Sequence, residues 1–521
     1  MDEKKNVTKA AGKMSVATFI SRILGFVRDM IFASYFGASG LSDTFFAAFK
    51  IPNLLRELFA EGSMSSAFVP VLTEYRQKKG EEEARRLVKI AFTFIIIVVG
   101  TVCIAGIVFS DAIVAVIAPG FLDSPEKFTL TVLLTRIMFP FLLFISAASL
   151  VMGALNTKRV FFVPALAPAM LNITLILSIV FFESRSSQPI IAAAAGVMVG
   201  GFVQFAFQLP SFYKCKYRLG IDMNFRHPGL KQMFILLIPA TLALSVSQIN
   251  IVVSNILASY LPSGSITYLF YSMRLIQFPV GIFGVAMGMA ILPTLSVHAA
   301  KGDFDSLRED FSFALRLLFF ITVPSMAGLI FLREPIVNTL FQRGAWDYAA
   351  TTGTSQALLF YSLGIWAIVG VRIVAASFYS MQDTKTPVKI AVIAMTANLI
   401  LSILLMGPLK HSGLALANAA ASSINFIVLF YMLKRKMGRI DGKNIFLSFA
   451  KISAVSAVTG LASWFIIRGD MWTEGGRTIQ KAGILSGVIL FFIAAYLLIM
   501  HLSGSKELKY LLEMRKRKKR A

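Results

Sequence analysis

Charged and hydroxyl side chains interrupt several stretches of this sequence that are otherwise apolar. A charge that faces lipid near the bilayer centre costs ~2.5–3.5 kcal/mol. We therefore expect these side chains to face a wet or protein-lined interior. The candidates for substrate contact are Ser21, Arg22, Arg28, Lys50, Arg56 and Arg274. The candidates for a charge network or a gate are Asp29, Asp43, Glu57 and Glu61, and no catalytic residue or metal ligand is predicted.

The spacing of these residues places them on shared helix faces. Ser21 and Arg28 are seven residues apart, and Asp43, Lys50 and Glu57 follow one another at the same interval. Seven residues make about two turns of an α-helix, so each set lines one face. For the acidic residues, an internal salt-bridge network that holds the helices together is an equally good interpretation.

The arginines point to an anionic substrate. A planar guanidinium offers paired donors that match phosphate and carboxylate oxygens. Arg274 lies in an apolar stretch, 265–298, that contains no acidic residue to neutralise it. We therefore expect Arg22, Arg28 and Arg274 to bind a substrate, most simply through a phosphate group. We also expect Arg28 and Arg274 to have no structural partner.

The composition places these residues in a membrane protein. The chain has 521 residues, of which 56% are hydrophobic and 15% are charged, and its mean hydropathy is +0.73. A typical soluble domain has about 25% charged residues. Apolar runs long enough to cross a ~30 Å hydrocarbon core recur from end to end. The sequence predicts an all-α polytopic protein with fourteen transmembrane helices, at 14–37, 41–75, 87–118, 129–156, 160–183, 189–213, 230–260, 265–298, 309–332, 349–379, 387–407, 411–433, 446–467 and 480–503.

The basic residues set the predicted orientation. The net charge is +24, but most of the 51 Lys and Arg residues lie in short loops between apolar runs, as in the cytoplasmic loops of membrane proteins. This arrangement argues against nucleic-acid binding and places both termini in the cytoplasm. The final basic run, 515–520, is interpreted as a topology anchor attracted to anionic lipid.

The sequence also repeats itself. Residues 33–36 recur as 258–261 and residues 156–158 recur as 383–385, at offsets of 225 and 227. Each copy contains six predicted helices, so the two copies have the same orientation. Lys50 and Arg274 then occupy equivalent positions. The predicted division is a first lobe at 1–220, a second lobe at 221–440, and two further helices with a basic cytoplasmic tail at 441–521.

Other signals narrow the function. The sequence contains no Walker A motif, so nothing in it suggests ATP hydrolysis. Two cysteines, Cys103 and Cys215, and four scattered histidines argue against a disulfide framework or a metal site. The eighth predicted helix carries Gly281, Gly284 and Gly288, which predict either a hinge or close helix packing.

Several motifs resemble the MurJ/MviN family: 21–29 (SRILGFVRD), 42–46 (SDTFF), 49–56 (FKIPNLLR), 59–62 (FAEG), 245–248 (SVSQ), 274–275 (RL) before 278–279 (FP), and 382–387 (QDTKTP). The resemblance implies a flippase of the multidrug/oligosaccharidyl-lipid/polysaccharide exporter superfamily. Such a protein moves lipid II, the undecaprenyl-pyrophosphate-linked peptidoglycan precursor, from the inner to the outer leaflet by alternating access. The resemblance also maps the family's cavity arginines onto Arg22, Arg28, Arg56 and Arg274, and its important acidic positions onto Asp29, Asp43 and Glu61.

The resemblance leaves the cargo and the energy source open. Its implied location is the bacterial cytoplasmic membrane, and its implied partners are lipid II or a similar polyprenyl-pyrophosphate lipid and the cell-wall synthesis machinery. Alternative activities are a flippase for another polyprenyl-linked oligosaccharide and, with less support, a drug exporter or a membrane enzyme. No cofactor is expected. The resemblance implies that carboxylates of helices 7 and 11 bind sodium in some members, but the predicted helices 7, 11 and 12 contain no Asp or Glu. Coupling to membrane potential or protons therefore has at least as much support as coupling to sodium.

Overall fold

The computed structural model describes residues 2–57, 63–182, 188–438 and 440–520, apart from the side chains of 2–11, 63–66, 239–240, 242–247 and 514–520. Every regular element in these ranges is a helix, which confirms the predicted all-α fold. The chain divides into two compact units, Met1–Gly264 and Ser265–Ala521, which are described separately below.

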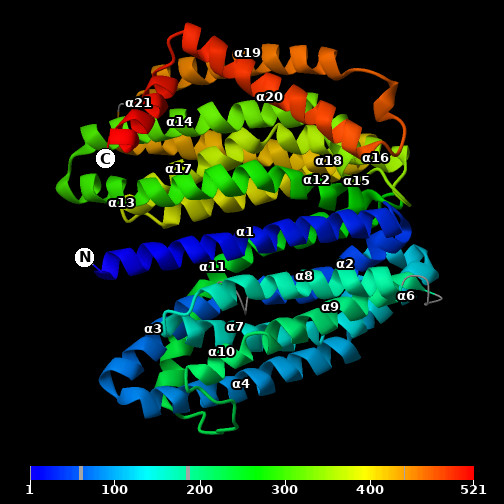
Figure 1. Cartoon of the computed structure of the whole chain (residues 1–521), viewed down its shortest axis with the longest axis vertical. Helices are drawn as coiled ribbons and strands as arrows, with labels where there is room; N and C mark the ends of the chain where they lie inside the picture. Colours follow the sequence, from blue (N-terminus) through cyan, green and yellow to red (C-terminus); the bar gives the residue numbers. More distant parts are fainter. Residues whose placement is uncertain (1, 58–62, 183–187, 439, 521) are drawn as a thin grey trace. The chain divides into compact units, whose positions relative to one another are not determined.

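Unit 1 contains the N-terminal helices (Figure 1). They are α1 (Asp2–Phe36), α2 (Gly40–Arg56), α3 (Ser63–Lys78), α4 (Gly80–Val108), α5 (Ser110–Ile117), the 3-10 helix η2 (Pro119–Asp123), α6 (Pro125–Met138), α7 (Phe141–Thr157), α8 (Phe162–Phe182), α9 (Pro189–Ala206), α10 (Leu209–Lys214) and α11 (Pro228–Ser259).

Unit 2 contains the remaining elements. They are α12 (Ser265–Pro279), the π-helix η4 (Val280–Gly284), α13 (Val285–Lys301), α14 (Phe304–Phe331), α15 (Arg333–Phe341), α16 (Tyr348–Ser362), α17 (Ile365–Ser380), α18 (Lys385–Met437), α19 (Gly442–Ile467), the 3-10 helix η5 (Asp470–Trp472), α20 (Thr478–Leu502) and α21 (Lys506–Arg520).

These helices match the predicted apolar segments, although several predicted helices are broken. Among the described residues, ten helices are long and apolar enough to cross a membrane; α1, α2 and α3 are not among them. The predicted count of fourteen spans is therefore not confirmed. The predicted helices 387–407 and 411–433 form the single long element α18, which changes direction at Lys410, where φ is 50°.

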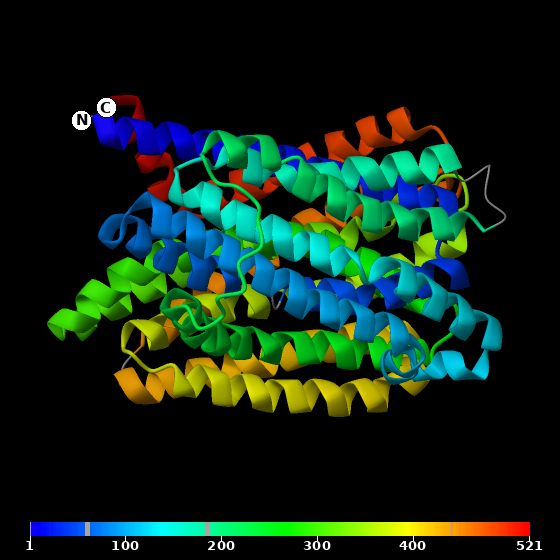
Figure 2. The same ribbon diagram turned by 90° about the horizontal axis from the view of Figure 1, so that it is seen from below.

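Helix α8 holds α1 in unit 1. Helix α8 packs against α1 and against α9 (Figures 1 and 2). Gly196 allows the close approach of α9, because a Cβ at this position would lie 2.7 Å from Cβ of Ser178. The Ser178 hydroxyl donates to the carbonyl of Ala192 across the same interface, at 2.5 Å. The position of the charged face of α1 is therefore set by packing on α8.

Helix α11 belongs to unit 1 by its contacts. Asn255 donates to the carbonyl of Ile117 at 3.0 Å, and the Ser259 hydroxyl accepts from the amide of Gly120 at 3.1 Å. The compact units thus divide the chain after Gly264. The repeat boundary between 220 and 221 concerns sequence similarity rather than packing, and it stays a prediction.

Unit 2 is built around α14, which packs against α17 and α19. Gly460 on α19 allows this approach, because a Cβ there would lie 2.3 Å from the ring of Phe331. The Tyr496 hydroxyl of α20 donates to the carbonyl of Phe320 at 2.9 Å. The two predicted C-terminal helices therefore pack directly on the core of unit 2.

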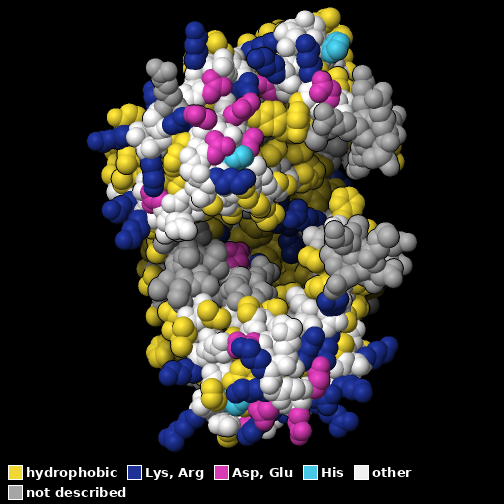
Figure 3. All heavy atoms as spheres, turned by 90° about the vertical axis from the view of Figure 1, so that its left-hand side faces the viewer, with side chains coloured by type: hydrophobic (Ala, Val, Ile, Leu, Met, Phe, Trp, Pro, Cys, Tyr) yellow, Lys and Arg dark blue, Asp and Glu magenta, His cyan; other side chains and the backbone are white. Residues whose placement is uncertain are grey.

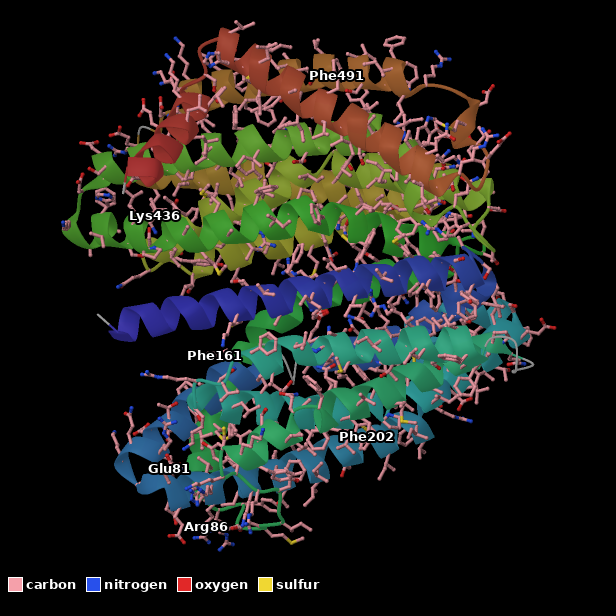
Figure 4. The ribbon with its side chains drawn as sticks, viewed as in Figure 1. Glu81, Arg86, Phe161, Phe202, Lys436 and Phe491 are labelled. Atoms are coloured by element: carbon pink, nitrogen blue, oxygen red, sulfur yellow. The ribbon has the colours of Figure 1, made fainter. Side chains whose placement is uncertain are left out.

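The surface chemistry follows the membrane pattern. Large apolar side chains are exposed along the helices, among them Phe202 on α9 and Phe491 on α20, which are 49% and 44% exposed (Figure 4). Charged side chains are frequent over the helix ends drawn in Figure 3, where Lys and Arg stand among Asp and Glu. Exposed apolar helix sides with charged ends are what a bilayer requires.

Candidate functional site

Arg28 on α1 is part of a hydrogen-bonded cluster inside unit 1. Its Nη2 lies 2.6 Å from Oδ1 of Asp29, and its Nη1 donates to Oδ1 of Asn172 on α8 at 3.0 Å. Asn172 in turn donates to the carbonyl of Ser21 at 3.2 Å. The expectation that Arg28 has no structural partner is therefore wrong. The Arg28 side chain is 18% exposed. Its contact with a substrate stays a prediction.

Arg22 has a different environment on the same helix. Its side chain is exposed, and within the described ranges it forms no hydrogen bond or ion pair. Arg22 lies about 9 Å along the helix axis from Arg28, at 1.5 Å per residue. The two arginines therefore differ in role: Arg28 is tied to α8, while Arg22 is available to a ligand.

The C-terminal end of α2 carries a second polar cluster. Arg56 donates to Oδ1 of Asn53 at 3.1 Å and lies 3.8 Å from the carboxylate of Glu57. Asn53 donates to the same carboxylate at 3.2 Å, and Gln248 of α11 donates to its other oxygen. Glu57 therefore joins α2 to α11 through a hydrogen bond from a neutral amide, whereas its ion pair is with the adjacent Arg56. Arg56 is 22% exposed and keeps part of its guanidinium accessible.

Lys50 is half-buried, two residues before Pro52 in α2. Glu57 follows seven residues later, directly after the end of α2. The contact of Lys50 with a substrate and the predicted shared face of α2 stay predictions.

Asp43 is a structural residue at the other end of α2. It is 3% exposed, and its Oδ2 accepts from the amide of Gly264 at 2.6 Å. Gly264 has a φ of 93°, in the left-handed region that favours glycine. The carboxylate therefore fixes the turn after α11, which agrees with the alternative that Asp43 holds helices together. Glu61 lies outside the described residues.

Arg274 lies on α12 in unit 2. Its side chain is half-buried, nine residues after the start of the helix. Two residues in its neighbourhood interact with the rest of unit 2: Ser272 donates to the carbonyl of Thr354 at 2.8 Å, and the ring of Tyr271 contacts that of Trp346. These contacts hold the first half of α12 against α16. Arg274 itself interacts with other residues, so the expectation that it has no structural partner is wrong. Its contact with a substrate stays a prediction.

Three polar residues of these units were not predicted from the sequence as site residues. Asn172 and Gln248 complete the two clusters of unit 1, and Arg372 on α17 is an exposed cation in unit 2. Asn172 and Arg372 lie inside predicted apolar helices, so both could have been identified from the sequence as polar residues in apolar segments. Gln248 stood in the quoted SVSQ motif, but nothing in the sequence paired it with Glu57.

Outside the membrane-spanning segments, ion pairs join residues near the ends of neighbouring helices. In unit 1, Lys158 contacts Glu81 at 2.6 Å, near the end marked by Glu81 and Arg86 in Figure 4. In unit 2, Lys436 contacts Asp383 at 2.6 Å. The hydrogen bonds from Lys436 and from the amide of Thr386 lower the pKa of the Asp383 carboxyl to about 2. The repeated motif at 156–158 and 383–385 therefore lies at helix junctions.

The fold recurs in solved membrane transporters. A solved inward-facing multidrug resistance MATE family transporter of the MOP superfamily aligns with a TM-score of 0.67 at 14% identity, covering 82% of this chain and 98% of that one, and it shares the fold. The family model described as lipid II flippase MurJ matches residues 32–476. The chain belongs to the lipid II flippase MurJ family, whose members are transporters rather than enzymes.

Individual relatives agree with this assignment. The probable lipid II flippase MurJ of Vibrio cholerae is 36% identical over 508 residues, covering 96% of this chain and 97% of the relative. The lipid II flippase MurJ of Burkholderia cenocepacia is 34% identical over 507 residues, covering 96% and 98%. A solved lipid II flippase MurJ in an inward closed conformation aligns with a TM-score of 0.76 at 30% identity, covering 94% and 98%. The resemblance predicted from the motifs is thereby confirmed.

Proposed function

We propose that this chain moves lipid II from the inner to the outer leaflet of the cytoplasmic membrane. We further propose that Arg22, Lys50 and Arg56 of unit 1, and Arg274 of unit 2, each contact its pyrophosphate in the course of the crossing. As a member of the MurJ family, the chain is a lipid II flippase. The family supports the cargo, and the charges on the described helices support the way it is held. No covalent step is required for this activity.

Arg22 carries the proposal. An exposed arginine inside the apolar part of α1, with no partner among the described residues, needs a ligand or water to satisfy its donors. A pyrophosphate offers oxygens in the geometry that a guanidinium binds with two parallel hydrogen bonds. Arg28 is committed to Asp29 and Asn172, so we assign it mainly to placing Arg22 and Ser21 correctly on α1.

The proposed cycle has three steps. The arginines bind the pyrophosphate while the site is open to the cytoplasm, and the isoprenoid tail stays in lipid. A change of conformation then opens the site to the outside, and release resets the transporter. A substrate shifts this equilibrium only by the difference between its affinities for the two states. We propose that membrane potential, protons or sodium supply the direction.

The test compares charge and shape at two positions. We expect Arg22→Gln and Arg274→Glu to lose lipid II binding, because the first removes a donor fork and the second repels a pyrophosphate. Arg274→Lys keeps the charge and should retain part of the binding, although it loses the bidentate fork. Lys443→Gln removes an exposed cation on α19 and is the matched control.

The readouts are lipid II binding by each purified variant and complementation of a strain depleted of its own flippase. Thermal melting confirms that each variant is folded. Wild-type binding by both Arg22→Gln and Arg274→Glu would overturn the proposed phosphate site. Binding of an unrelated polyprenyl-linked oligosaccharide in preference to lipid II would reassign the cargo.

A further inference from the structure

Arg372 is a cation on the most enclosed helix of unit 2. Helix α17 packs against α13, α14, α18 and η4, and residues 373–378 are all buried. Arg372 itself is exposed, and the described part of the chain provides it with no hydrogen bond or ion pair. A charged side chain that is exposed on an otherwise enclosed helix faces an opening rather than the core.

The depth of Arg372 makes lipid an unfavourable environment for this side chain. It lies eight residues before the end of α17 at Ser380, which is about 12 Å along the helix axis. That distance is longer than an extended arginine side chain, so the guanidinium cannot reach the helix end by snorkelling. Ionisable residues at such depth usually face a water-filled path and contact what moves through it.

The facing helix leaves room beside this arginine. Cβ of Arg372 lies 3.5 Å from the position that a Cβ on Gly288 would take, and its Cδ lies 3.5 Å from that of Gly284. A Cβ on Gly284 would also approach Val369 to 2.9 Å, so this glycine permits close packing. Contact with α17 thus explains Gly284 and Gly288 but not Gly281, whose added Cβ would meet nothing within 4 Å, and no side chain at 284 or 288 covers Arg372.

The segment that contains Gly284 and Gly288 also carries Arg274. The segment continues from α12 through η4, where Pro279 removes a backbone donor and the helix widens into a π-turn. Gly284 and Gly288 follow Arg274 by ten and fourteen residues, or about 15–20 Å along the helix. Unit 2 therefore presents two cations at different depths beside one segment.

We propose that Arg372 is a further substrate-positioning residue of unit 2, which binds the pyrophosphate of the polyprenyl-linked cargo at a depth different from that of Arg274. The inference rests on the proposed function, since it needs an anionic head group that crosses inside the protein. With the predicted orientation, Arg372 lies nearer the cytoplasmic side than Arg274. It then contacts the head group earlier in the crossing.

The experiment measures binding of two probes to the purified full-length protein: undecaprenyl pyrophosphate, and undecaprenol, which has the same tail without the charge. We expect Arg372→Gln to weaken undecaprenyl pyrophosphate binding about tenfold, as expected for the loss of one charge-assisted contact. Arg372→Lys should stay within about threefold of wild type. Undecaprenol binding should be unchanged in both variants, and Lys443→Gln should leave both probes unaffected.

The outcomes separate this inference from the proposed function. Wild-type pyrophosphate binding by Arg372→Gln, with weakened binding by Arg274→Gln, would overturn the role of Arg372 alone. Wild-type binding by both variants would overturn the phosphate site as well. Equal loss for undecaprenol would show a structural role and also overturn the inference.

A second variant covers the case in which Arg372→Gln does not fold. Gly288→Leu keeps the arginine and adds a side chain whose Cβ lies at ordinary contact distance from it. We expect the folded variant to lose pyrophosphate binding to a similar extent, because the leucine occupies the space beside the arginine side chain. Full binding by a folded Gly288→Leu protein would also count against the inference.

Discussion

Replacing Asp29 with asparagine tests whether the Arg28 ion pair holds α1 in place. The Asp29 side chain is 4% exposed, and the shorter of its contacts with Arg28 is 2.6 Å. In Asp29→Asn the guanidinium loses its carboxylate and keeps the oxygen of Asn172 at 3.0 Å. The volume is unchanged, so any loss of stability comes from the missing charge rather than from a cavity.

The burial of the pair sets the expected magnitude. Removing one partner of a fully buried ion pair costs about 3–5 kcal/mol, whereas an exposed pair contributes about 0–1 kcal/mol. Arg28 is 18% exposed and keeps a neutral partner, so we expect a loss of about 2 kcal/mol in the free energy of unfolding. The matched control is Asp111→Asn, whose pair with Arg136 has side chains 59% and 45% exposed; here we expect at most about 1 kcal/mol.

The assay is denaturant unfolding in detergent micelles for wild type, both single variants of the pair and the double variant Arg28→Gln/Asp29→Asn. The double-mutant cycle isolates the coupling between the two side chains, which we expect to be about 1–2 kcal/mol. The structural role is refuted when Asp29→Asn destabilises the protein no more than Asp111→Asn does.

Three further predictions concern other parts of the molecule. Lys481 is 2% exposed and donates to Asn338 at 3.0 Å, so Lys481→Met should lower the melting temperature by several degrees; an unchanged melt would show that this contact does not hold α20 to α15. The lowered pKa of Asp383 means that its pair with Lys436 stabilises the fold fully above pH about 4, and that this contribution is lost as the pH falls through about 2. The difference in melting temperature between wild type and Asp383→Asn should therefore be constant from pH 7 to 4 and shrink below pH 4, and a difference independent of pH would contradict it. Finally, a cysteine at Ser39 in a cysteine-free background should react with an impermeant thiol reagent from outside the cell; labelling only after lysis would reverse the predicted orientation.

The site was predictable in its residue types but not in its pairings. Arg22, Arg28 and Arg274 stand out in apolar segments because charges are costly there, and a single sequence is enough to find them. A single sequence contains no pattern that reveals a hydrogen bond between residues far apart in the chain. The pairing of Arg28 with Asn172 spans 144 positions, and that of Glu57 with Gln248 spans 191. The expectation of an unpartnered Arg28 failed for this reason.

The sequence by itself determined the all-α membrane class, the places of most helices and the family, since composition, apolar run length and local motifs are properties of neighbouring residues. Tertiary structure alone decided which charges hold the helices and which face an opening. Asp43 became a turn anchor because Gly264 folds back onto it. Arg372 became a candidate for substrate contact because it is exposed on α17 and lies against Gly284 and Gly288, which have no side chain to cover it. Those distinctions depend on which helices pack together, and packing joins residues that the order of the chain keeps far apart.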